Sequence, residues 1–293
     1  MNKLLEKIPF VNHILKGIGQ IMLQENPWTG LLFLIGIFIG SWQYGVAAIV
    51  ATAAATATAQ LLKYEAHEIN AGLYGFSAAL VGTGLAFLFN HTLLLWLLII
   101  VGGVLAAIVQ HFFIIKKIPA YTLPFIVITW GFVFLIHKYL PIPAADLLQT
   151  KPESTSYDKY FTITNGFGEV IFQENKFSGI LFFLGVIISN PVAAGYGLAA
   201  SLSGAVFSWM NGQPIEQIQM GLFGFNAVLT AIVFSAVKKN SWLWVLAGTA
   251  ITVAIHNLLV SVSFFSQVGG VFTFPFVAGT WLTLLIQKIF IKN

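Results

Sequence analysis

A chain that repeats its own sequence must fold into something that holds two copies of one element order. Three blocks of this 293-residue sequence recur at a nearly constant offset of 149 to 151 positions. The pairs are Gln24-Glu25-Asn26 with Gln173-Glu174-Asn175, residues 72–80 with 221–229, and Thr122-Leu123-Pro124-Phe125 with Thr273-Phe274-Pro275-Phe276. Shared apolar composition does not explain three blocks in one register, so the sequence predicts two structural repeats, residues 1–145 and 146–293.

Most of each repeat is apolar. Hydrophobic residues make up 58% of the chain and charged residues 8%, whereas soluble domains are roughly 25% charged. Ten apolar runs follow one another along the chain, at about 28–42, 44–62, 72–90, 92–115, 119–137, 177–190, 192–210, 220–237, 241–263 and 270–290. Such runs indicate membrane-spanning helices, so we expect an all-α integral membrane protein with five spans in each half.

An odd number of spans makes the second half enter the membrane from the opposite side. The two halves are therefore predicted to have inverted topology, related by a pseudo-two-fold axis in the membrane plane. With both termini in the cytoplasm, ten lysines would be cytoplasmic: Lys3, Lys7, Lys16, Lys63, Lys116, Lys117, Lys238, Lys239, Lys288 and Lys292. Only Lys138, Lys151, Lys159 and Lys176 would lie outside. This bias favours a multi-pass protein of the cell (plasma or inner) membrane, embedded in lipid, with cytoplasmic termini.

A short, more polar segment precedes the first span of each half, at residues 10–24 and 160–173. Irregular backbone at membrane depth is tolerated only where protein or water surrounds it. We therefore expect one short re-entrant helix per half, whose terminal carbonyls could meet a permeating molecule. The alternative is an amphipathic helix on the membrane surface, a pattern that residues 1–19 also fit.

Several classes of function lack support in the sequence. The lysines are scattered between apolar runs, which argues against binding of nucleic acid. The chain has no cysteine, and His111, His137 and His256 are dispersed, so neither a metal nor another cofactor is expected. Because no His-Glu-x-x-His motif, paired intramembrane aspartates or serine with a credible base is present, we do not expect an enzyme.

Three segments resemble the urea transporter family: residues 26–31 (Asn-Pro-Trp-Thr-Gly-Leu), residues 72–82, and residues 118–125 (Ile-Pro-Ala-Tyr-Thr-Leu-Pro-Phe). The last is similar to the family signature Leu-Pro-x-x-Thr-x-Pro-Phe, with Ile118 in place of the leucine. In the second half, residues 269–276 read Gly-Gly-Val-Phe-Thr-Phe-Pro-Phe and lack the leading Leu-Pro. The resemblance extends from about residue 18 to residue 285.

The resemblance implies a homotrimer in which each protomer passes urea passively through its own pore. In that family a narrow slot is flanked by phenylalanine rings and lined on one side by oxygens. Carried over to this chain, the slot residues are the polar pair Gln20 and Glu169, the carbonyl-bearing Ile21 and Val170, the following Leu23 and Phe172, the wall residues Phe76, Leu80, Phe225 and Leu229, and the threonines Thr122 and Thr273. Leu23 is aliphatic where an aromatic residue is expected.

These residue types suit urea, which is flat and neutral and carries four N–H donors. Side-chain and backbone oxygens would replace its lost water, and ring faces would hold it edge-on to them. A dehydrated cation would find too few ligands between the rings. Urea must also leave, so its affinity should be weak, on the order of millimolar.

Other interpretations remain open at the level of sequence. Glu169 could cap an interfacial helix, Phe76 and Phe225 could be core or lipid-facing residues, and Thr122 and Thr273 could bond to the preceding turn. An ion-coupled secondary transporter of a small polar solute could use Glu169 as its acid. An ammonium or water channel is a third possibility.

Overall fold

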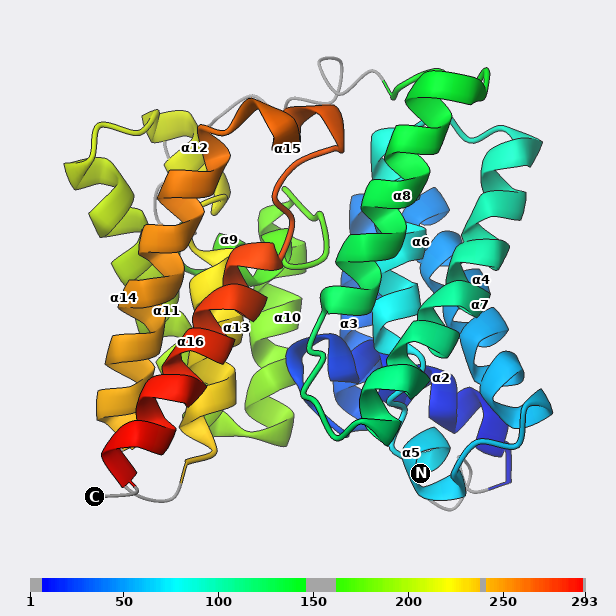
Figure 1. Cartoon of the computed structure of the whole chain (residues 1–293), viewed down its shortest axis with the longest axis horizontal. Helices are drawn as coiled ribbons and strands as arrows, with labels where there is room; N and C mark the ends of the chain where they lie inside the picture. The colour runs from blue at the N-terminus through cyan, green and yellow to red at the C-terminus, as the bar shows by residue number, and fades with distance from the viewer. Residues whose placement is uncertain (1–6, 146–161, 238–240, 292–293) are drawn as a thin grey trace. The chain divides into compact units, whose positions relative to one another are not determined.

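The computed structural model describes residues 7–145, 162–237 and 241–291, and these residues are predominantly helical (Figure 1). In these ranges the chain forms no β-strand, only an isolated bridge between Phe89 and Ala144. The expected all-α fold is confirmed. Some predictions fall outside the described residues: those for residues 1–6, Tyr160 and Lys3, Lys151, Lys159, Lys238, Lys239 and Lys292.

The chain divides into two compact units. Unit 1 comprises Met1–Glu153 with Gln267–Gly269, and unit 2 comprises Ser154–Ser266 with Gly270–Asn293. The helices up to the first gap are α2 (Pro9–Gly19), η1 (Gln20–Met22), α3 (Pro27–Gly40), α4 (Trp42–Leu61), α5 (Ala66–Asn70), α6 (Phe76–Leu88), α7 (Leu93–Ile115) and α8 (Leu123–Tyr139). Those that follow are α9 (Thr162–Glu169), α10 (Lys176–Ser189), α11 (Pro191–Met210), α12 (Ile215–Met220), α13 (Phe225–Ser235), α14 (Ser241–Val260), α15 (Ser263–Gln267) and α16 (Phe274–Ile291).

Four helices begin several residues later than the apolar runs that predicted them. These are α6, α8, α13 and α16. The residues before them form turns that contain left-handed backbone, at Gly72 (φ 78°), Tyr121 (φ 48°), Gly221 (φ 91°) and Phe272 (φ 46°). A left-handed residue cannot continue a right-handed helix. Hydropathy alone cannot detect these turns, because their residues are as apolar as those of the helices.

The same left-handed positions recur in both units. Leu23 (φ 59°) matches Phe172 (φ 58°), and Lys63 (φ 55°) matches Gly212 (φ 72°), each pair 149 positions apart. Gly72 matches Gly221 at this offset, and Tyr121 matches Phe272 at 151. The two units therefore share local backbone turns as well as sequence motifs.

Glycine is required at the turn before α6 and at its counterpart before α13. A Cβ at Gly72 would lie 2.5 Å from the backbone nitrogen of Gly17, and one at Gly221 would lie 2.5 Å from the carbonyl carbon of Asn165. Both glycines also have positive φ, which other L-residues adopt at a cost. The turn at Gly72 thus lies close to the backbone of α2, and the turn at Gly221 lies close to the backbone of α9.

Within the described ranges, five helical segments are long and apolar enough to cross a membrane: Trp42–Leu61, Leu93–Ile115, Pro191–Met210, Ile215–Ser235 and Ser241–Val260. A sixth candidate is the pair Pro9–Met22 and Pro27–Gly40, which is bent by 78° at its break and is a broken span or a re-entrant loop. Four other apolar helices are shorter: Phe76–Leu88, Leu123–Tyr139, Lys176–Ser189 and Phe274–Phe290. The chain is a multi-pass membrane protein.

The four shorter helices are not long enough to cross a membrane alone, as the prediction of ten spans requires. At 1.5 Å per residue, the 13-residue α6 covers about 20 Å of a hydrocarbon core about 30 Å thick. Such a helix can complete a crossing only together with the segment that precedes it. The turn before α6 would then fall at membrane depth, where buried backbone groups need partners inside the protein.

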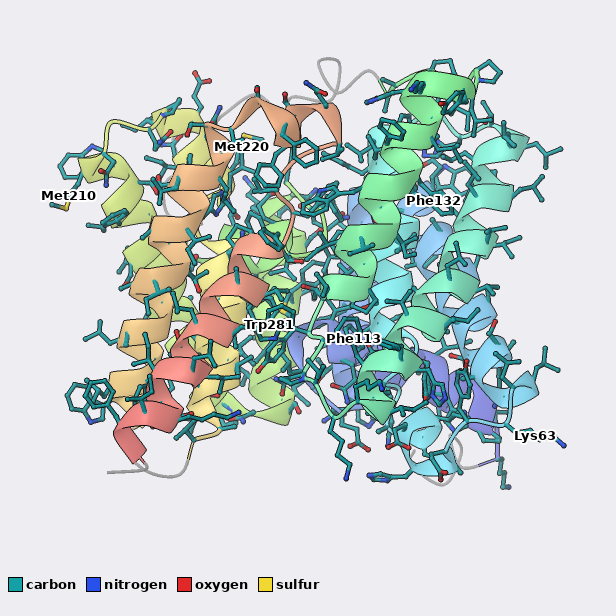
Figure 2. All side chains as sticks on the ribbon, in the orientation of Figure 1. Lys63, Phe113, Phe132, Met210, Met220 and Trp281 are labelled. Atoms are coloured by element: carbon teal, nitrogen blue, oxygen red, sulfur yellow. The ribbon has the colours of Figure 1, made fainter. Side chains whose placement is uncertain are left out.

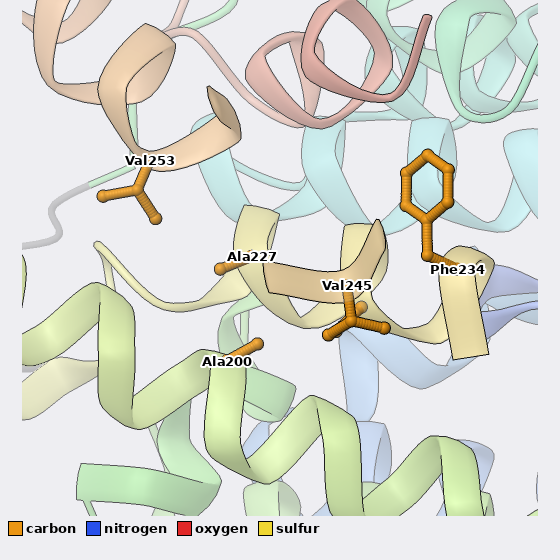
Figure 3. Packing of buried hydrophobic residues seen from close by; sticks show 6 residues of the cluster. Ala200, Ala227, Phe234, Val245 and Val253 are labelled. Atoms are coloured by element: carbon orange, nitrogen blue, oxygen red, sulfur yellow. The ribbon is translucent and has the colours of Figure 1, made fainter. Parts of the chain in front are cut away.

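Helix α13 packs against both α11 and α14 in unit 2 (Figure 1). Small side chains, among them Ala200 and Ala227, let these helices approach (Figure 3), and Phe234 is fully buried in the same cluster. In lipid, such close contact takes over from hydrophobic burial as the source of helix association. Large apolar side chains point outward instead, as Met210 does at the end of α11 (Figure 2).

Candidate functional site

The first candidate segment is a sharp turn between α2 and α3. Helix α2 begins with Pro9 in its first turn, and after Gly19 the chain tightens into the 3₁₀ helix η1. Leu23 then takes the left-handed conformation (φ 59°) and ends η1. Asn26 caps α3 by accepting a hydrogen bond from the Trp28 N–H at 2.9 Å. This sequence of caps and turns fixes the entry into α3.

Unit 2 builds the same turn between α9 and α10. Phe172 is its left-handed residue, and Asn175 caps α10 by accepting from the Phe177 N–H at 2.9 Å. Side-chain amides brace both turns: Gln24 Nε2 donates to the Met22 carbonyl at 2.7 Å, and Gln173 Nε2 donates to the Ile171 carbonyl at 2.9 Å. The repeated Gln-Glu-Asn block therefore encodes this turn: its glutamine braces it and its asparagine caps the next helix.

Helix α2 packs into unit 1. His13, Ile14, Leu15, Gly17, Ile18 and Gly19 are all buried in it. A helix lying on the membrane surface would bury only an apolar face, whereas here a histidine and two glycines are buried as well. The packing favours the re-entrant interpretation of residues 10–24.

Gln20 and Glu169 occupy matched positions in the two turns. Gln20 Nε2 donates to the Ala71 carbonyl at 3.0 Å, which leaves Oε1 as the group that this side chain can present. Oε1 of Glu169 is buried and has no hydrogen-bond partner among the residues that the structure describes. Each turn therefore places a side-chain oxygen at its start, and within the described residues the Glu169 oxygen is buried without a donor.

Phe76 with Leu80, and Phe225 with Leu229, begin α6 and α13. The four-residue spacing puts each pair on one helix face. All four side chains are buried, Phe225 being the most exposed at 9%. Their burial fits a wall inside the protein and contradicts the alternative that they face lipid.

Thr122 and Thr273 stand at the starts of α8 and α16, and both are 2% exposed. Each follows a left-handed aromatic residue, Tyr121 or Phe272. Their carbonyls accept the first helical hydrogen bonds, from Ile126 at 3.1 Å and from Val277 at 3.2 Å. The Thr-x-Pro pattern thus marks a tight turn followed by a helix start.

Each unit brings its own candidate residues together. In unit 1, α6 contacts both η1 and α8, so the Gln20, Phe76 and Thr122 segments adjoin. In unit 2, α13 contacts α9 and α16, and the Phe172 and Phe272 rings lie 5.9 Å apart. The structure thus contains two clusters of candidate residues, one in each unit and at matched positions, which we call half-sites. One difference is Leu23, which is aliphatic and 38% exposed, whereas the matched residue of unit 2 is the aromatic Phe172.

Sequence reasoning missed several buried polar residues around the half-sites. Asn226 and His256 hydrogen-bond to each other beside Phe225, and Gln24 and Gln173 brace the turns. A signal was present: Asn226 replaces Ser77 inside an otherwise closely repeated block. A polar side chain that differs between two copies of one motif identifies a contact that only one copy makes.

Comparison with known proteins agrees with these features. The urea transporter family model matches residues 11–288. Urea transporter 1 of Capra hircus is 26% identical over 299 residues, covering 96% of this chain and 78% of its own. Urea transporter 1 of Ovis aries is similar to the same extent, and that of Mus musculus is 27% identical over 241 residues, covering 77% of this chain and 62% of its own. Members of the family are channels or transporters, not enzymes. The chain belongs to the urea transporter family.

Proposed function

We propose that this protein is a passive urea channel and that its two half-sites line one slot in each protomer of a homotrimer. The observation that carries the proposal is the matched pair of turns, each with a side-chain oxygen, from Gln20 or Glu169, beside an apolar wall. Family membership supplies urea as the solute. The passive mechanism, the slot and the trimer are proposed in addition to what family membership supplies.

The oxygens form one side of the proposed slot. The hydrogen bonds that close the first turn use the carbonyls of Gly19, Gln20 and Met22, and this supports a role for the Ile21 carbonyl as an acceptor. Val170 is its counterpart. Urea N–H groups would pass from these carbonyls to the side-chain oxygens and to the hydroxyls of Thr122 and Thr273. Each bond made replaces one lost to water, so the barrier stays low.

The apolar walls set what can enter. Phe76 and Phe225, with Leu80 and Leu229 one turn further, would press a flat solute between them, and Leu23 and Phe172 would narrow the approach. A planar amide held between these walls can still donate its N–H groups to the oxygens on the open side of the slot. A hydrated cation does not fit, and a dehydrated one would meet ring faces on the sides away from the oxygens.

The proposal also assigns the topology. Five spans per half place the two repeats in opposite orientation, and the lysine distribution puts both termini in the cytoplasm. Within each half, the turns before α6 and α8, or before α13 and α16, would then lie near the bilayer midplane, as the binding segments of inverted-repeat transporters do.

Urea flux into proteoliposomes of the purified protein tests this function. With equal pH and equal NaCl on both sides, we expect urea to enter faster than into protein-free liposomes and to stop at the external concentration. An imposed proton or sodium gradient should change neither result. Urea entry at the protein-free rate would contradict the proposal.

One observation favours a second candidate. The Oε1 oxygen of Glu169, which has no hydrogen-bond partner among the described residues, could bind a proton or a cation, as in an ion-coupled transporter. That mechanism predicts accumulation of urea above the external concentration when an ion gradient is imposed. The same liposomes separate an ammonium or water channel, because methylammonium or water flux would then exceed urea flux and urea analogues would not compete.

A further inference from the structure

Asn226, the second residue of α13, ties together three other segments of unit 2. Its side chain is 1% exposed. Oδ1 accepts from the N–H of Phe276 at 3.0 Å, and Nδ2 donates to the carbonyl of Phe272 at 3.2 Å. Nδ2 also lies 3.3 Å from Nδ1 of His256. One amide therefore links α13 to α14, to the turn before α16 and to α16 itself.

The chemistry of the partners fixes the orientation of this amide. A backbone N–H can only donate, so Oδ1 must face Phe276, and a carbonyl can only accept, so Nδ2 must face Phe272. The second Nδ2 hydrogen then points to Nδ1 of His256, which must be the unprotonated ring nitrogen. All three bonds coexist in one arrangement only, with a neutral histidine.

Two of these bonds hold the backbone on either side of Thr273. Asn226 holds the carbonyl of the residue before the threonine and the N–H of the residue three positions after it. Phe272 is a bulky residue with φ 46°, a conformation that persists only where the surroundings impose it. The bond to its carbonyl is such a constraint.

Asn226 also caps the first turn of α16. Helix starts leave their first N–H groups without helical partners. Here the Phe274 N–H donates to the Val271 carbonyl at 3.1 Å, Pro275 has no N–H, and the Phe276 N–H donates to Asn226. Asn226 therefore supplies a side-chain acceptor to the start of α16.

The contacts of Asn226 also extend to Phe225 of the aromatic wall, through His256. Phe225 directly precedes Asn226, and its ring meets that of His256 edge-on, with centroids 5.5 Å apart. The asparagine thus sets the position of Thr273 relative to Phe225. Unit 1 has no equivalent: Ser77, at the matched position, is 1% exposed, and its Oγ has no hydrogen-bond partner within the described part of the chain.

We infer that Asn226 is a positioning residue for selectivity: it holds Thr273 and Phe225 at the separation that a flat amide requires. The inference rests on the proposed function, in which both residues line the slot. It makes the second half-site the stricter of the two, because Ser77 cannot do the same for Thr122 and Phe76.

The test compares entry of urea and of N-methylurea into proteoliposomes for Asn226→Ser, which copies the first half, alone and combined with Thr273→Val. We expect Asn226→Ser to lower the urea to N-methylurea ratio about tenfold, and Thr273→Val to lower it as well. The double variant should lie within about twofold of Thr273→Val, since Asn226 acts through the threonine. Asn226→Gln keeps both polar groups but displaces them, so it should shift the ratio in the same direction. It replaces Asn226→Ser as the test variant if the serine protein does not assemble.

Two controls separate positioning from general stability. Thr230→Val removes the buried 2.9 Å contact to Thr252 and the 3.1 Å hydrogen bond to the backbone carbonyl of Asn226, but leaves the three bonds of the Asn226 side chain in place. Ser77→Ala alters the matched residue of unit 1. Both variants should keep the wild-type ratio. An unchanged ratio in the Asn226 variants, or equal effects in both Thr273 backgrounds, would overturn the inference while wild-type urea flux stands. Wild-type flux equal to that of protein-free liposomes would overturn the proposed function itself.

Discussion

The rings of Phe172 and Phe272 meet edge to face, with centroids 5.9 Å apart and planes inclined by 77°. Both residues are left-handed: Phe172 ends the turn that starts at Glu169, and Phe272 precedes Thr273. This contact joins two of the turns that make up the second half-site. The matched residues of the first half, Leu23 and Tyr121, cannot form an aromatic pair.

Phe172→Leu, which copies Leu23, should loosen the second half-site. An edge-to-face pair contributes about 0.5–1.5 kcal/mol beyond its buried area, so we expect discrimination between urea and N-methylurea to fall about two- to tenfold. Stopped-flow light scattering of proteoliposomes measures both solutes. Phe177→Leu, at a side chain that is 57% exposed on α10, is the control and should behave as wild type. Equal discrimination in all three proteins would remove Phe172 from the slot.

Glu169→Ala should lower urea permeability about tenfold to a hundredfold, because a urea N–H left without an acceptor away from water costs about 1–3 kcal/mol. Glu169→Gln should recover most of the flux, since Gln20 presents an amide oxygen at the matched position. Glu216→Ala, at an exposed acid on α12, is the control. A glutamine variant as inactive as the alanine variant would show that a titratable carboxyl is required, and would favour ion coupling over a passive slot.

Inverted topology can be read from one pair of matched residues. Leu61 and Met210 are the last residues of α4 and α11, lie 149 positions apart, and are 80% and 74% exposed. The chain has no cysteine, so Leu61→Cys and Met210→Cys each introduce a single thiol. In intact cells, a membrane-impermeant maleimide should label Met210→Cys only, and Leu61→Cys should need permeabilised cells. Labelling of both from one side would contradict the inversion.

The glycines of unit 2 predict a graded series of thermal stabilities. Gly221 combines φ 91° with a backbone neighbour at 2.5 Å, Gly212 has φ 72° and open space, and Gly195 lies within α11 with open space. Gly212→Ala should therefore cost about 1–2 kcal/mol, and Gly221→Ala more, because the backbones must also separate. Gly195→Ala should be neutral or stabilise by up to about 1 kcal/mol. Melting temperatures in detergent give the order, and a Gly221→Ala protein as stable as Gly212→Ala would refute the close approach.

The sequence was informative where periodicity and repetition carry the signal. Apolar runs located the helices, and the Gln-Glu-Asn repeat located the two sharp turns. It was silent where apolar residues leave the helix, because the left-handed Tyr121 and Phe272 are aromatic residues of types that also occur within the helices. Hydropathy therefore overestimated α6, α8, α13 and α16 at their starts.

Long-range polar contacts were equally hidden. The bonds of Asn226 span 30 to 50 residues along the chain, from 3.0 to 3.3 Å. No local pattern encodes such partners, since they depend on how α13, α14 and α16 pack. Comparing the two repeats gives the one available clue, the exchange of Ser77 for Asn226.

The central claim is that both half-sites line a single conduit, and the position of a bound urea tests it most directly. We suggest an experimental structure of the protein soaked with selenourea, whose selenium can be located by anomalous scattering. The account predicts sites between the phenylalanine rings, with solute nitrogens about 2.7–3.2 Å from the side-chain oxygens of Gln20 and of Glu169. Selenium found elsewhere, or Gln20 and Glu169 facing separate spaces, would contradict it.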